Sequence, residues 1–141
     1  MMAKTAHVTW VTKRQFVGVD DSKHSVVISS QDEDNGTGMS PSTLLLVALG
    51  GCTAYDVVSI LEKKRQRLTG LEVVVTGEQD EEPPWRYHKI HIHYEARGKG
   101  LREKALRDAI ELSEKKYCSV AATVRDVAEI TFDYTIIEAE A

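Results

Sequence analysis

The sequence is poor in cysteine and lacks the short motifs that indicate common catalytic or metal sites. Its two cysteines, Cys52 and Cys118, do not form a CxxC pair, so neither has the local spacing of a zinc ribbon or a thioredoxin-type site. No HExxH, P-loop or GxGxxG sequence is present, and no Ser/His/Asp order indicates a hydrolase. The cysteines are either two inert buried thiols or a reactive pair that the fold brings together.

The chain also lacks an excess of positive charge. Its 18 Lys and Arg residues stand against 22 Asp and Glu residues, which gives a net charge of −4. Nucleic-acid-binding proteins usually carry a basic excess or stripe, so we expect no nucleic-acid partner. A chain of 141 residues is close to the size of an average domain, and we expect a single domain over residues 1–141.

Long apolar runs are missing as well. The N-terminus has no apolar stretch behind Lys4 and is not a secretory signal. The most apolar run, Leu44 to Leu49, is far shorter than the about 20 residues that a membrane span needs. We therefore expect a buried helix there, no membrane association and a cytoplasmic location, where thiols are normally reduced.

The periodicity of apolar residues predicts an α+β protein without repeats. Ser40 and Pro41 are typical of a helix N-cap and first position, and the tolerance of Gly50 and Gly51 inside a helix indicates a close backbone approach, with a possible kink. The expected elements are strands near 8–11, 16–17 and 25–29, helix 41–67, strands 71–77 and 87–96, helices 101–116 and 118–127, and strand 128–137.

Local features support reactivity of the cysteines, but the residues alone favour inert thiols. Gly50 and Gly51 leave room beside the sulfur of Cys52. Cys118 is expected near a helix N-terminus after two lysines, and both features lower the pKa of a thiol.

Other candidates are weaker. His91 and His93 share one face of an expected strand, but they lack a third metal ligand, so a solvated sheet face is the favoured interpretation and we expect no metal and no cofactor. The favoured interpretation of Arg14 is a surface residue, and that of the basic run Lys63 to Arg67 is a solvated helix end.

Two segments, each containing one cysteine, resemble the OsmC/Ohr superfamily and most closely its smaller YhfA-like branch. The first runs from Ser40 to Leu61 and contains Gly-Gly-Cys, then three other residues, then Asp-Val-Val-Ser-Ile-Leu. The second runs from Glu114 to Val120 and contains Lys-Tyr-Cys-Ser-Val. The resemblance implies an OsmC-like α+β fold: an intertwined homodimer with curved antiparallel sheets around two long central helices.

The resemblance also implies a cysteine-based peroxidase that reduces organic hydroperoxides in an oxidative stress response. Cys52 would be the attacking thiolate and Cys118 the resolving thiol, and an external dithiol would reduce the resulting disulfide. Arg14 would be the substrate-binding or thiolate-stabilising arginine.

The sequence departs from the family's well-studied peroxidases at one place. Those proteins have an acidic residue one or two positions after the proline, where this chain has Ser42 and Thr43. An alternative function on the same fold is therefore a low-turnover redox-sensing module or a binding module for a small apolar ligand.

Overall fold

The structure is a computed structural model that describes residues 2–140. It comprises two compact units, one before and one after the boundary between Leu45 and Leu46. The predicted α+β class is confirmed, with two three-stranded sheets, one in each unit.

The first unit is a three-stranded antiparallel sheet in the order β1-β2-β3. Its strands are β1 (Ala6–Thr12), β2 (Gln15–Asp20) and β3 (Ser25–Ser29). The bounds of β3 match the predicted strand, whereas β1 and β2 extend beyond the predicted ranges 8–11 and 16–17. Every residue of β1 is exposed, and Val8 and Trp10 are 63% and 66% exposed. This strand therefore presents apolar side chains that the chain itself does not cover.

Helix α1 (Pro41–Lys63) begins where the sequence predicts. The side chain of Ser40 accepts a hydrogen bond from the backbone N–H of Thr43, and Pro41 is the first helical residue. The helix runs unbroken through both glycines. It ends earlier than predicted, at Lys63, because Arg65 takes a left-handed conformation (φ 57°) and Arg67 already begins the next strand. The basic run thus includes the predicted helix end at Lys63, but its remaining residues form a turn and the first residue of β4.

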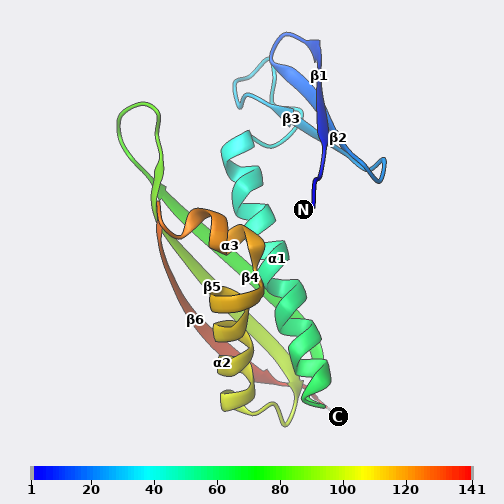
Figure 1. Ribbon diagram of the computed structural model, residues 1–141, viewed down its shortest axis with the longest axis vertical. Coiled ribbons are helices and arrows are strands. Elements are labelled where there is room, and N and C mark those ends of the chain that lie inside the picture. Colours follow the sequence, from blue (N-terminus) through cyan, green and yellow to red (C-terminus); the bar gives the residue numbers. More distant parts are fainter. Residues whose placement is uncertain (1, 141) are drawn as a thin grey trace. The chain divides into compact units, whose positions relative to one another are not determined.

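The second unit is a sheet with helices on one face, as Figure 1 shows. Its strands are β4 (Arg67–Gln79), β5 (Tyr87–Lys99) and β6 (Glu129–Glu138), and its helical segments are the remainder of α1, α2 (Glu103–Leu112), a π-helical turn η1 (Ser113–Tyr117) and α3 (Ser119–Val124). As predicted, β5 turns Ile90, Ile92, Tyr94 and Ala96 inward, and all four are at most 1% exposed. They form the core with residues of α1 and α2.

One detail of the expected sheet differs. β4 and β5 are antiparallel, but β6 pairs with β5 in parallel. A parallel neighbour requires a crossover connection, and α2, η1 and α3 supply it. The single helix predicted over 101–116 is divided within this connection. The helix α2 ends at Leu112, and the π-helical turn changes the direction of the chain before α3.

The face of α1 that packs on the sheet is apolar and buried, including Leu49, Val57 and Leu61, as expected for a core helix of a soluble fold. By length and composition alone, α1 would also be able to cross a membrane, a test that core helices of soluble proteins pass too. The prediction of a helix covered on all sides does not hold within one chain, because Val47 and Tyr55 are 51% and 75% exposed.

The close approach predicted for the glycines is confirmed for Gly50 only. A Cβ at Gly50 would lie 3.0 Å from Cγ2 of Val75 on β4, whereas a Cβ at Gly51 would meet nothing within 4 Å. Gly50 therefore sets how closely α1 packs on the sheet, and Gly51 has no such role within the chain.

We predict different effects for alanine at these two positions in monomeric protein. There, Gly51→Ala should raise the free energy of unfolding by up to about 1 kcal/mol, because alanine favours the helix and meets no neighbour within the chain. Gly50→Ala gains the same helix propensity but presses on stiff, β-branched Val75, so it should be less stable than Gly51→Ala. Chemical denaturation of both variants checks this, and equal stabilisation would contradict the packing argument.

Candidate functional site

Cys52 and Cys118 come from different elements of the second unit. Cys52 lies in the middle of α1, one residue after Gly51. Cys118 lies between η1 and α3, where its side chain accepts a hydrogen bond from the backbone N–H of Ala121, so it caps α3 as the sequence predicts. Its own N–H donates to the carbonyl of Ser113, five residues earlier, which is the hydrogen bond of a π-helical turn.

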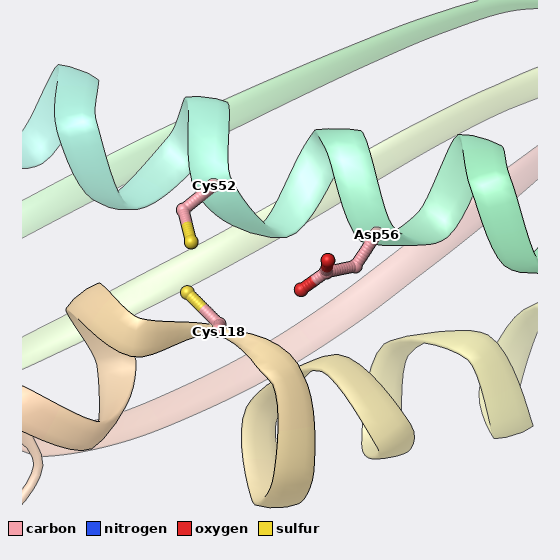
Figure 2. A group of neighbouring side chains, drawn as sticks. All are labelled: Cys52, Asp56 and Cys118. Atoms are coloured by element: carbon pink, nitrogen blue, oxygen red, sulfur yellow. The ribbon is translucent and has the colours of Figure 1, made fainter. Parts of the chain in front are cut away.

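The structure brings the two cysteines together. Their sulfur atoms and a carboxylate oxygen of Asp56 all lie within 4.8 Å of one another. Figure 2 shows Cys52 and Asp56 on the same side of α1, with Cys118 facing them from the η1–α3 junction. Both thiols are free; Cys118 is buried and Cys52 is half-buried.

The pKa of Cys52 is lowered from its ordinary value. Burial on its own raises this pKa, but several hydrogen bonds to the sulfur outweigh it. The donors are the thiol of Cys118, the backbone N–H of Val120, and the side chain and backbone N–H of Ser119. Cys52 is therefore the cysteine that ionises first.

The pKa of Cys118 moves in the opposite direction, which corrects the expectation that a helix start and two lysines lower it. Burial is the main cause, and the hydrogen bond that its thiol donates to Cys52 and the negative charge there raise the pKa further. The Ala121 N–H lowers it only in part. The side chains of Lys115 and Lys116 belong to exposed residues of η1.

A buried chain of hydrogen bonds ends at Asp56. The Tyr94 hydroxyl lies 2.7 Å from Oγ1 of Thr53, which lies 3.0 Å from Oγ of Ser113, and that oxygen lies 2.8 Å from Oδ2 of Asp56. The Ser113 hydroxyl is the donor towards both Thr53 and Asp56, so its single proton is shared between these two acceptors. This chain fixes the carboxylate beside the sulfurs.

Sequence reasoning missed Asp56 and Ser113. Asp56 follows Cys52 by four residues on a helix, and this spacing places two side chains on one face, so the signal was present. Ser113 has no comparable signal, because its position opposite α1 depends on the π-helical turn.

A groove of about 550 Å³ adjoins the site at Asp56. Apolar and aromatic side chains contribute to its wall, namely Tyr55, Ile60, Leu112 and Tyr117. The rest of the lining is polar or charged and includes Lys63 and Lys64. The groove provides space for a small molecule beside Asp56, and neither cysteine lines it.

The histidines lie where the sequence places them, on the partly solvated face of the second sheet. His91 Nε2 and His93 Nδ1 are 2.8 and 2.7 Å from the same oxygen of Asp133, and His91 Nδ1 is 2.7 Å from the hydroxyl of Thr131. The hydrogen bonds from His93 and His91 lower the pKa of Asp133. The interaction joins β5 to β6.

Arg14 lies in the turn between β1 and β2 in the first unit. Its backbone N–H donates to the Asn35 side chain, and its carbonyl accepts from Ser30. Its role at the thiolate stays a prediction.

In the same unit, the Ser40 hydroxyl donates to Thr43 at 2.9 Å, so Thr43 belongs to the cap of α1.

Comparison with known proteins identifies the family of this chain. The family model described as OsmC-like protein matches residues 17–133. Protein YhfA of Escherichia coli (strain K12) is 38% identical over 134 residues, which cover 95% of this chain and 98% of YhfA.

Solved structures agree with this match. The crystal structure of a hypothetical protein from Aquifex aeolicus has a TM-score of 0.89 and 30% identity, covering 99% of this chain and all of that one (100%). The organic hydroperoxide resistance protein OhrB of Bacillus subtilis shares the fold, with a TM-score of 0.63, 13% identity, and coverage of 95% and 98%. The chain belongs to the OsmC/Ohr family of OsmC-like proteins.

Proposed function

We propose that this protein is a cysteine-based peroxidase that reduces organic hydroperoxides through Cys52 and Cys118. The observation that carries the proposal is the proximity of two free thiols, within 4.8 Å, of which only Cys52 has a lowered pKa. The fold shared with a protein named for organic hydroperoxide resistance supports the choice of substrate. Apolar side chains in the groove beside Asp56 suit an apolar peroxide.

In the first step, the thiolate of Cys52 attacks the outer oxygen of the hydroperoxide. The O–O bond breaks, the alkoxide takes up a proton and leaves as an alcohol, and Cys52 is oxidised to a sulfenic acid. Cys118, as a thiolate, then attacks this sulfur; the S–O bond breaks and the oxygen leaves as water after taking up a proton. An external dithiol supplies two electrons and regenerates both thiols by exchange.

The second step needs only a local movement. A disulfide has an S–S distance of about 2.05 Å, so the sulfurs must move closer from a separation of no more than 4.8 Å. Cys118 lies at a junction between two short helical segments, η1 and α3, where small backbone changes are easier than inside a long helix.

We also propose a cytoplasmic homodimer whose two structural units form one OsmC-like domain. OsmC/Ohr proteins are commonly dimeric, and the family match spans both units. In each unit, exposed apolar residues fit a surface that a second copy covers: Val8 and Trp10 on β1 in the first unit, and Val47 and Tyr55 on α1 in the second. A reducing compartment keeps the resting thiols ready to react.

A specific observation favours the alternative of a low-turnover redox sensor. The principal groups that lower the pKa of Cys52 are neutral donors, Cys118, Ser119 and Val120, and Ser42 and Thr43 supply no carboxylate to orient an arginine. A sensor would be oxidised once and would wait for a partner, whereas a peroxidase turns over.

We predict that Cys52→Ser abolishes peroxide consumption, because serine is not ionised near neutral pH. Reduced wild-type protein should consume many equivalents of cumene hydroperoxide when a dithiol is supplied, and Cys118→Ser should form a sulfenic acid but no intrachain disulfide. Peroxide assays and mass spectrometry check both variants. Activity that survives in Cys52→Ser would contradict the proposal, and consumption that stops near one equivalent in the wild type would support the sensor.

The hydrogen bond between the thiols predicts a shift in the pKa of Cys52. Cys118→Ala removes the donor and should raise this pKa, because the Cys52 thiolate loses a hydrogen bond that stabilises its charge. Cys118→Ser keeps a hydroxyl donor and should shift it less. Thiolate absorbance against pH, in the presence of a chelator, measures both; identical curves would show that the thiol of Cys118 does not stabilise Cys52.

The proposed dimer predicts that a charge on the exposed face of α1 disrupts association. Val47→Asp should give a monomer, because the carboxylate would be buried without a partner. Val127→Asp is the matched control, since Val127 is equally exposed (51%) but follows α3. Sedimentation velocity over a range of concentrations distinguishes the two. A Val47→Asp protein that stays dimeric would place the interface elsewhere.

A further inference from the structure

The proposed peroxidase chemistry uses the two sulfurs but gives no role to the Asp56 carboxylate that lies beside them. Three potential ligand atoms, from Cys52, Asp56 and Cys118, lie within 4.8 Å of one another. Cys52 and Asp56 project from successive turns of α1, and Cys118 faces them from the η1–α3 junction (Figure 2). The donors thus converge on one small volume from two sides.

The dimensions of this volume suit a tetrahedral zinc ion. With Zn–S bonds of about 2.3 Å and Zn–O bonds of about 2.1 Å, the donors of such a site are separated by about 3.5–3.8 Å. The observed limit of 4.8 Å means that the donors would need to close by no more than about 1.3 Å. Rotation of the three side chains is enough for an adjustment of this size.

The surroundings orient the donors as outer-shell groups do at zinc centres. Ser113 donates a hydrogen bond to Oδ2 of Asp56 at 2.8 Å, and the N–H of Ala121 donates to the sulfur of Cys118 at 3.3 Å. Such partners fix a ligand's rotamer and stabilise its negative charge. Ser113 is fully buried, so the orientation of Asp56 is well defined.

We propose that the reduced protein binds one Zn²⁺ per chain through Cys52, Cys118 and Asp56, with water in the fourth position. Two thiolates with one carboxylate select a thiophilic borderline ion such as Zn²⁺ over Mg²⁺ or Ca²⁺, which prefer oxygen ligands alone. Neither thiol is within a CxxC spacing, which is why the sequence does not indicate this site.

Zinc binding and thiol oxidation exclude each other. A sulfur that is bound to zinc is not free to attack a peroxide, and a disulfide has no thiolate left to bind zinc. The metal would therefore inhibit the site reversibly. This regulatory consequence rests on the proposed peroxidase function, whereas the binding of zinc does not.

The test measures metal binding to the full-length reduced protein without any peroxide. Zinc affinity is determined by competition with a chromophoric chelator, and Co²⁺ is used in parallel because its absorption reports bonds to sulfur. We expect one metal ion per chain with a thiolate-to-cobalt band. Oxidised wild-type protein should show no such band, and reduction should restore it; this comparison needs no mutation.

Matched variants assign the ligands. Asp56→Asn should weaken zinc binding by at least about 10-fold, and Cys118→Ser should abolish the two-thiolate spectrum. Glu62→Gln removes a charge from an exposed position of the same helix and should bind like the wild type. His93→Ala controls for the separate histidine pair and should keep the cobalt–thiolate band. Circular dichroism confirms that each variant is folded.

The outcomes separate this inference from the proposed function. Reduced wild-type protein without a cobalt–thiolate band, or with an affinity that Asp56→Asn does not change, would overturn the site. Zinc binding in a protein that fails to reduce hydroperoxides would leave the site standing and overturn the peroxidase. Where both hold, one equivalent of Zn²⁺ should suppress peroxide consumption, and a chelator should restore it.

Discussion

The site depends on the buried hydrogen-bond chain from Tyr94 through Thr53 and Ser113 to Asp56. It joins β5, α1 and the π-helical turn, and its three hydroxyl-bearing residues are at most 1% exposed. Burial raises the pKa of Tyr94, so its hydroxyl stays protonated. A buried hydroxyl that loses its partner costs about 1–3 kcal/mol, so the three elements favour one mutual arrangement. That arrangement also determines where Cys118 lies relative to Cys52.

The π-helical turn connects this buried hydrogen-bond chain to the position of Cys118. A regular α-helix continuing from α2 would carry the chain along the same axis, whereas the turn closes a hydrogen bond between Cys118 and Ser113 five residues apart. The same residue, Ser113, therefore contacts Asp56 through its side chain and Cys118 through its backbone. Two of the three groups at the site are positioned by one buried serine.

Much of the fold follows from local pattern, and the site mostly does not. The inward set of β5, the cap of α1 at Ser40 and the start of α3 at Cys118 are readable from periodicity and capping preferences, because these are short-range effects. The direction of β6 and the end of α2 depend on the crossover connection, which no local signal specifies.

The pairing of the cysteines shows the same limit. Their separation in sequence leaves contact undetermined, and only the resemblance to a family indicated that they meet. Asp56 was accessible through helical spacing. The sequence does not predict that the pKa values of the two thiols shift in opposite directions. The sequence features near Cys118 favour a lower pKa, while burial in the folded chain raises it.

The opposite pKa shifts of the thiols also order the two steps of the proposed reaction. While Cys52 is a thiolate, its charge and its hydrogen bond keep the proton on Cys118. Attack on a peroxide turns Cys52 into a neutral sulfenic acid, which removes that charge and accepts a weaker hydrogen bond. The charge then no longer raises the pKa of Cys118 and the hydrogen bond raises it less, while burial is still opposed by the N–H groups of Ala121 and Val120. Cys118 thus becomes easier to ionise only after Cys52 has been oxidised, when a resolving thiolate is needed.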